Sequence, residues 1–244
     1  MPDDSNNGRE LFEQVLAGTL RAVADDKDLE VSFTSDTPGL TPSGARISHL
    51  PYSFDLETIT NLRGEADSIA LKHRFHDPDL HRKLSPNGEK GQAIFNAVEQ
   101  ARYECMGALR MPGVGANLKK LGLKRATENG LTRRAGDLAF EDIAAPALAE
   151  LVREKLLGEA PNLDLGEAYT QARIRLDELC GHMLDMLVDR REDQTKTAII
   201  TRAIVEELVG ESAGDRREEE QMQNMPDEQD GEEAEDESEG DDDG

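Results

Sequence analysis

The sequence of 244 residues contains no tryptophan, only two cysteines and few aromatic residues, which make up 4% of the chain. Without large rings, a hydrophobic core must be built from Leu, Ile, Val, Ala and Met, and this composition favours helices over strands. The two cysteines, Cys105 and Cys180, lie within apolar helical patterns. One pair in a chain of this size is not a disulfide framework, so we expect reduced thiols in the core of a cytoplasmic protein.

Long apolar runs and catalytic motifs are also missing. No run approaches the ~18 apolar residues that a membrane-spanning helix requires, so no membrane association is expected. The acidic, polar N-terminus MPDDSNNGRE does not have the pattern of a signal or transit peptide. No phosphate-binding loop, Rossmann glycine pattern or G-x-S-x-G nucleophile motif occurs. The sequence therefore predicts no catalytic residue and no cofactor bound by this chain.

Negative charge is concentrated at the C-terminus. Residues 215–244 carry sixteen acidic and two basic side chains, which is −14 of the net charge of −24. A net negative chain is poorly suited to phosphate contacts, so no nucleic-acid partner is expected. From residue 211 onward, few apolar side chains remain to offset the entropy of ordering the backbone, roughly 1–2 kcal/mol per residue. We predict one helical domain over residues 1–210 and a disordered polyacidic tail over residues 211–244.

Apolar spacing predicts a mostly α fold, a helical bundle-like domain with at most one short strand. The strand is expected around residues 29–33, where apolar and polar residues alternate. Residues 35–52 and 122–140, which are rich in loop-forming residues, are expected to be loops. Helices are expected over residues 11–25, 55–77, 89–110, 114–121, 141–157, 164–190 and 192–209.

Three histidines, His73, His76 and His81, lie within nine residues. His73 and His76 would share a helix face, so this segment could hold a metal ion. The same segment is rich in Lys and Arg, and positive side chains are favoured at a helix C-terminus. A solvated basic helix end is the preferred interpretation, and metal ligation remains the alternative.

The helix predicted over residues 89–110 carries Glu99, Arg102, Glu104 and Arg110 on its polar side. Spacings of three residues allow salt bridges worth only ~0.2–0.5 kcal/mol each on a helix surface. A surface helix is the preferred interpretation, although a face presented to a partner subunit would look the same. The residues predicted to contact such a partner are Glu99, Arg102, Arg110 and Asn117.

A second positive patch follows this helix. Because it contains no interleaved aromatic residues, it does not suggest single-strand nucleic-acid binding. We expect a solvated loop that could also meet the acidic tail or an acidic partner. Its members are Lys119, Lys120, Lys124, Arg125, Arg133 and Arg134.

Several strings between Ala66 and Leu118 resemble the N-terminal region of the CobT subunit of aerobic cobaltochelatase. The resemblance covers about residues 10–118 and is looser to about residue 210. The acidic segment that follows is similar in character to the acidic linker of the family. Together the strings are specific to the family, but none of them is a catalytic motif. They are ADSIALK at 66–72, HDPDLHR at 76–82, AVEQAR at 97–102, and RMPGV at 110–114 followed by Asn117-Leu118.

The resemblance implies an accessory, non-catalytic subunit of an ATP-dependent machine for cobalamin synthesis. In that family a ring-forming AAA+ ATPase, CobS, assembles with CobT, and the pair acts on the large CobN subunit. CobN inserts Co²⁺ into hydrogenobyrinic acid a,c-diamide. The resemblance thus implies a hetero-oligomer in the cytoplasm, with ATP-Mg on the partner subunit and cobalt as substrate of the complex. The family's acidic linker leads into a von Willebrand-type metal-site domain, which is missing before Gly244, so we expect a fragment or a short variant.

Two other functions are compatible with the sequence. A run of like charge could make the chain an acidic adaptor or holdase that captures basic partners through its tail. Deletion of residues 211–244 would abolish that function but would leave docking on an ATPase ring intact. The chain could also be a metal carrier that uses His73, His76 and His81.

Overall fold

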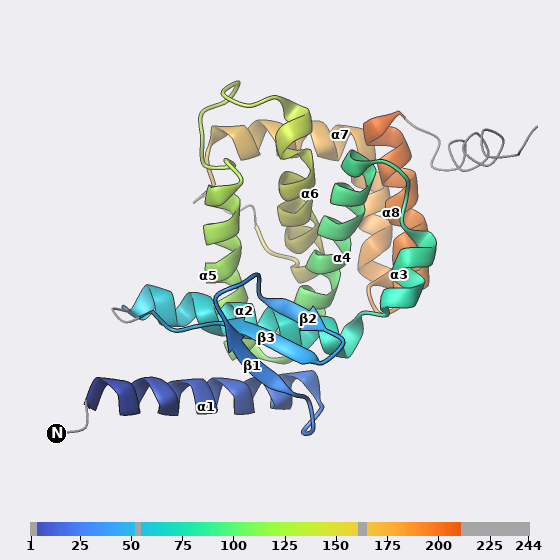
Figure 1. Ribbon diagram of the computed structural model, residues 1–244. Coiled ribbons are helices and arrows are strands. Elements are labelled where there is room, and N and C mark those ends of the chain that lie inside the picture. The colour runs from blue at the N-terminus through green and yellow to red at the C-terminus, as the bar shows by residue number, and fades with distance from the viewer. Residues whose placement is uncertain (1–3, 52–54, 161–164, 211–244) are drawn as a thin grey trace, which may run out of the picture. The chain divides into compact units, whose positions relative to one another are not determined.

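Eight helices and three short strands make up the described residues, 4–51, 55–160 and 165–210, of the computed structural model (Figure 1). They confirm the predicted mostly α fold, whereas the predicted acidic tail lies outside the described residues. No described helix has the length and apolar content needed to cross a membrane. The elements are α1 (Asp4–Ala24), β1 (Val31–Thr34), β2 (Gly39–Thr41), β3 (Gly44–Ser48), α2 (Leu56–Phe75), α3 (Pro78–Leu84), α4 (Glu89–Arg110), α5 (Pro112–Glu128), α6 (Phe140–Leu157), α7 (Glu167–Arg190) and α8 (Gln194–Val209).

Local sequence signals set several helix ends. The Asp55 carboxylate accepts a hydrogen bond from the Thr58 N–H and so caps the start of α2. Asp77 caps α3 in the same way, and Pro78 follows it at a position where the missing N–H costs nothing. Helix α6 ends at Gly158, which adopts the left-handed conformation with φ of 65°.

The prediction of at most one short strand was wrong, because the structure contains a small three-stranded sheet. Strand β3 pairs in parallel with β1 and antiparallel with β2, giving the order β1–β3–β2. Most of the predicted loop over residues 35–52 is therefore not a loop: Gly39 and Gly44 begin β2 and β3, and Pro42 lies in the short turn between these strands. Ala45 and Ile47 are buried and alternate with Arg46 and Ser48. This two-residue period was the signal for β3.

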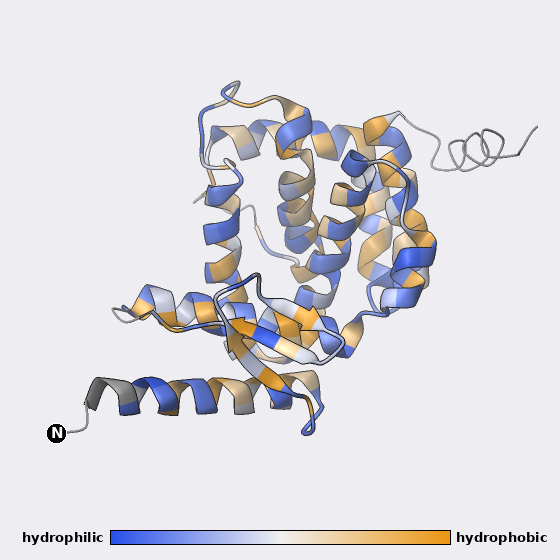
Figure 2. Ribbon diagram, viewed as in Figure 1, coloured by the Kyte–Doolittle hydropathy of each residue, from blue (hydrophilic) through white to orange (hydrophobic). Residues whose placement is uncertain are grey.

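Two hydrophobic clusters lie within the helical body. One is formed by α1, the sheet, α2 and the start of α5, and includes Leu20, Ile47 and Leu71. The other is formed mainly by α4, α6, α7 and α8, and includes Leu148 and Leu176. Hydrophobic and hydrophilic residues alternate along most helices in Figure 2, the pattern of amphipathic helices that pack on a core. Helix α4 contributes side chains to both clusters and so runs along the boundary between them.

Two glycines allow α2 to approach its neighbours closely. A Cβ atom on Gly107 of α4 would lie 2.3 Å from Leu71 Cδ2 on α2. A Cβ atom on Gly64 of α2 would lie 2.9 Å from the carbonyl oxygen of Asn117 on α5. A side chain at Gly107 would displace the Leu71 side chain, and one at Gly64 would push against the backbone of α5.

The predicted loop over residues 122–140 was wrong in its first part, since α5 continues to Glu128. Gly122 made a loop plausible, because glycine in a helix costs about 1 kcal/mol relative to alanine. In the structure this glycine is buried, and a Cβ atom there would lie 3.8 Å from Glu150 Oε1 on α6. The last three helices begin and end within three residues of their predicted bounds.

Candidate functional site

The charged side of α4 lies inside the protein, so the prediction of a surface helix was wrong. Glu99, Arg102 and Glu104 are 6%, 1% and 3% exposed. Every residue from 101 to 106 is buried, because neighbouring helices surround this part of α4. Apolar residues on all sides of a helix indicate burial, and this signal was present in the sequence. The charges of α4 are therefore parts of internal networks.

Arg102 is the centre of the first network. Its Nε and Nη2 atoms donate to the two carboxylate oxygens of Glu99 at 2.7 and 2.8 Å. Nη2 also donates to the Phe75 carbonyl at 2.6 Å, and Nη1 donates to the Arg191 carbonyl at 3.1 Å. This one guanidinium therefore joins α4 to the end of α2 and to the connection between α7 and α8.

His76 belongs to the same network and is not solvated. Its Nδ1 lies 2.7 Å from Glu99 Oε1, and both side chains are 7% exposed. Burial alone would raise the pKa of Glu99, but the hydrogen bonds from Arg102 and His76 outweigh it and hold the pKa below its ordinary value. Glu99 is therefore an anion enclosed by two donors.

The three histidines of the predicted metal site do not form one group, because the rings of His76 and His81 lie 4.8 Å apart between centroids but His73 has a different partner. Helix α2 ends at Phe75, so His73 and His76 do not share a helix face. His73 pairs with Asp26, whereas His81 Nε2 donates to Asn96 Oδ1 at 2.7 Å. Burial lowers the pKa of His81. Among the described residues no group of three or more His, Cys, Asp or Glu side chains could hold a metal ion.

Glu104 is the centre of the second network. Its Oε1 accepts hydrogen bonds from Ser68 Oγ at 2.6 Å and Arg125 Nη1 at 2.8 Å, and its Oε2 accepts from Arg153 Nη2 at 2.9 Å. Arg153 Nη1 also donates to Glu150 at 2.6 Å. Burial would raise the pKa of Glu104, but the two arginines lower it to about 2. One ionised carboxylate thus joins α2, α4, α5 and α6.

Asn117, a predicted partner contact, lies where α2 meets α5. Its Nδ2 donates to Asp67 Oδ2 at 2.8 Å, and Asp67 is 2% exposed. Burial raises the pKa of Asp67 to about 6, and the hydrogen bond from Asn117 only partly opposes this effect. Asp67 therefore differs from Glu99 and Glu104, because its burial outweighs its hydrogen bonding.

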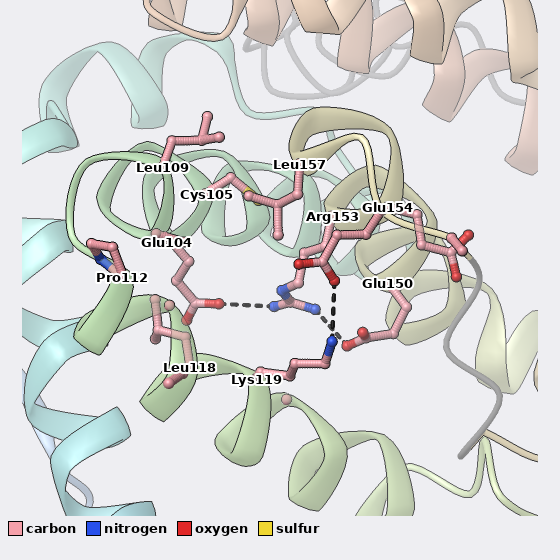
Figure 3. A pocket seen from close by; sticks show the side chains of 16 residues that line it. Glu104, Cys105, Leu109, Pro112, Leu118, Lys119, Glu150, Arg153, Glu154 and Leu157 are labelled. Atoms are coloured by element: carbon pink, nitrogen blue, oxygen red, sulfur yellow. Dashed lines mark hydrogen bonds and ion pairs between the residues drawn. The ribbon is translucent and has the colours of Figure 1, made fainter.

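A cavity of about 800 Å³ opens between α4, α5 and the end of α6 (Figure 3). The ion pairs from Glu104 through Arg153 to Glu150 lie along its wall. The exposed pair of Lys119 and Glu159, 3.3 Å apart, lies at its solvent side. The remaining wall is mainly apolar or small and consists of Cys105, Ala108, Leu109, Pro112, Gly115, Ala116, Leu118, Gly122, Leu157 and Ala160.

This pocket, which the sequence analysis did not identify, is the candidate site. Small residues on α4 and α5, such as Ala108 and Ala116, leave the space open, and their spacing was the only signal in the sequence. Both cysteines are unpaired and buried as expected, and burial raises the pKa of each thiol to about 12. Cys105 in the pocket wall is therefore a poor nucleophile.

Other predicted residues lie at the surface. Arg110 pairs with Glu192 at 2.8 Å, and its guanidinium carbon lies 4.8 Å from the ring centroid of Phe75. Arg133 and Arg134 are exposed in the loop before α6, as predicted. The other four basic residues of the predicted loop patch, Lys119, Lys120, Lys124 and Arg125, belong to α5 instead.

The described residues thus form a helical scaffold with buried ion-pair networks and a partly charged pocket, an arrangement suited to holding a ligand or a partner in a fixed position. The chain belongs to the CobT family, because the model of that family, described as cobalamin biosynthesis protein CobT, matches residues 6–244. This match confirms the resemblance and assigns the chain to cobalamin biosynthesis. No solved structure matches the chain.

Proposed function

We propose that this chain is an accessory subunit of an ATP-dependent cobaltochelatase and acts by binding a CobS-type AAA+ ATPase. The family match over residues 6–244 is the observation that carries the proposal. In this proposal the ATPase binds ATP-Mg, and a CobN-type large subunit inserts cobalt, the substrate, into hydrogenobyrinic acid a,c-diamide. The complex is a cytoplasmic hetero-oligomer.

The internal charge networks support this role, because they fix the relative positions of several helices. Arg102 connects α4 with the residues before α8, and Glu104 connects α4 with α5 and α6. A buried charge that loses its partner is strongly destabilising, so these helices resist independent movement. A body of this kind can present a preformed surface to a motor subunit.

The junction of α4 and α5 is the surface that we assign to the ATPase. Leu109 is 48% exposed there, next to Arg110 at the end of α4. Pro112 and Gly113 in the first turn of α5 are also exposed. An exposed apolar side chain with polar and charged groups around it matches the apolar core and polar rim of a protein interface. Glu99 and Arg102 would position this junction from inside the protein, while Arg110 would touch the partner directly.

The test is gel filtration of the full chain with a CobS-type ATPase and ATP-Mg. We expect co-elution, and we expect Leu109→Asp to weaken it, because a carboxylate at an apolar contact must be desolvated. Ile174→Asp on α7 is the matched control, since Ile174 is an exposed apolar residue at 53%. If neither protein shifts its elution volume in the presence of nucleotide, the proposal is wrong.

The acidic adaptor is the second candidate, and the −14 charge of residues 215–244 favours it. Removal of residues 211–244 separates the two functions. Capture of basic proteins would be lost if the adaptor function holds, whereas binding of the ATPase would persist if the helical body carries it.

A further inference from the structure

We infer that the pocket between α4, α5 and α6 receives an arginine or lysine side chain from a segment of the partner protein. The inference deepens the proposed function, because the partner meant is the AAA+ ATPase. Three properties of the pocket support it: its size, its apolar walls and the sign of its charge.

The size accommodates a short segment of a partner, and the walls fit a side chain with a long apolar stem. A volume of about 800 Å³ lies within the range of ligand pockets. Leu118 on α5 and Leu157 on α6 line it. Apolar walls accept the methylene groups of arginine or lysine while the charged end remains near water or a carboxylate.

The charge in the pocket selects a cation. Four of its six charged lining residues are acidic and two are basic. Phosphates and other anions would approach these carboxylates at a short distance, where repulsion in a partly buried groove is strong. The acidic pocket therefore favours a cation over nucleotides and anionic macrocycles as occupants.

Two of the four carboxylates are available to a guest. Glu104 is held by Arg125 and Arg153, and Glu154 accepts from Arg173 Nε at 2.9 Å. Glu150, in contrast, shares Arg153 with Glu104, and its Oε2 accepts no hydrogen bond from the described residues. Its side chain is 13% exposed and lies in the pocket wall.

Glu159 is the second available carboxylate. Its partner, Lys119, is 64% exposed and lies 3.3 Å away. An exposed pair of this kind contributes little to stability, so a guest cation can replace Lys119 at small cost. Glu150 and Glu159 thus form the cation end of the site, and Lys119 occupies part of it while no guest is bound.

The first experiment follows the pocket directly by methyl NMR of the full chain. The probes are the tripeptide acetyl-Leu-Arg-Leu-amide and its analogue with neutral citrulline in place of arginine. We expect saturable shifts at the methyl groups of Leu118 and Leu157, with affinity about tenfold higher for the arginine peptide, because one charge-assisted hydrogen bond differs. Equal affinity for the two peptides, or no saturable shift, would overturn the inference.

Variants assign the effect to the carboxylates. Glu150→Gln and Glu159→Gln should each weaken binding of the arginine peptide about fivefold or more. Lys119→Gln should strengthen it, because the competing cation is gone, and a purely structural role of Glu159 does not predict this gain. Glu178→Gln removes an exposed carboxylate of α7 outside the pocket and should change nothing. Should the control weaken binding as much as the pocket variants do, general charge attraction explains the result and the inference fails.

The second experiment uses the ATPase. Ala116→Phe fills the pocket from the exposed side of α5, where a larger side chain does not disturb the core. If the ATPase binds all pocket variants as tightly as the wild type, the inference fails but the proposed function stands. If the arginine peptide binds in the pocket but the ATPase does not bind the chain, the proposed function fails and the pocket's preference for a cation stands.

Discussion

Replacement of Glu104 by glutamine should destabilise the protein strongly. The substitution preserves the shape of the side chain but removes the charge that Arg125 and Arg153 face at 2.8 and 2.9 Å. The amide of glutamine would also point its N–H group toward one of the side chains that now donate a hydrogen bond to Glu104. We expect Arg153 to keep Glu150 as its partner, and Arg125 to lose the carboxylate with which it pairs.

Two independent arguments give the magnitude. The pKa of Glu104 falls from 4.5 to about 2, and this difference corresponds to about 3 kcal/mol of preferential stabilisation of the ionised form in the folded state. Removal of one partner from a buried ion pair typically costs about 3–5 kcal/mol. The two figures agree, so we expect a loss of about 3 kcal/mol or more in the free energy of unfolding.

The assay is urea unfolding followed by circular dichroism. The control is Glu192→Gln, which removes an exposed partner of Arg110 and should cost less than about 1 kcal/mol. Because the pKa of Glu104 is lowered on folding, its contribution is complete above pH 4.5 and is lost as the pH falls through 2. The wild type should therefore lose stability over this acid range, and the Glu104→Gln variant should lack that component.

The reasoning would be refuted by a small effect. If Glu104→Gln costs no more than the exposed control, the buried network does not hold the helices together. If the Glu104→Gln variant loses as much stability at acid pH as the wild type does, another carboxylate is responsible for the pH dependence.

Three further predictions concern other buried positions. Asp67→Asn should stabilise the protein by about 2–3 kcal/mol near neutral pH and by little below pH 3.8. The reason is that folding raises the pKa of Asp67 from 3.8 to about 6, so the wild type loses stability as the pH rises through 6 and the buried carboxyl ionises. Urea unfolding at both pH values measures this difference. Gly107→Ala should lower the free energy of unfolding by about 1–3 kcal/mol, because the new Cβ would lie 2.3 Å from a Leu71 methyl carbon. Gly113→Ala is the control: no atom lies within 4 Å of its new Cβ, so thermal unfolding should show a neutral or stabilising effect. Arg102→Lys should cost about 2–4 kcal/mol in urea unfolding, because lysine cannot reproduce the paired hydrogen bonds to Glu99; a cost below about 1 kcal/mol would show that the charge alone suffices.

Most of the helices could be predicted from the sequence because their local signals are strong, although α3 (Pro78–Leu84) was missed despite its capping residue. Asp55, Asp77 and Asp193 stand at the N-caps of three helices, and Gly158 ends a fourth. These residues act through their own neighbours in the chain, so the sequence alone determines the helix ends that they mark. The family strings between residues 66 and 118 likewise identified the family that the match confirms.

The burial of α4 could not be predicted with the same ease. The sequence around Glu99 and Arg102 is the same whether these side chains face water or the residues before α8. The partners that bury Arg102 are remote in the chain, so local patterns do not reveal them. The strand β3 was missed for a related reason: its parallel partner β1 precedes it by more than ten residues. The pocket has no sequence signature of its own, since it arises where three helices leave a space.

The long separation between Arg102 and its last partners has a consequence for biosynthesis. The guanidinium bonds to the Arg191 carbonyl, 89 residues later, and approaches Gln194, 92 residues later. On the ribosome the earlier helices are made before these groups, because synthesis proceeds from the N-terminus. Until then the centre of the protein holds a cation with part of its hydrogen bonding unmet. Completion of this network therefore requires the chain as far as the start of α8, and a chain released before residue 191 would lack both partners.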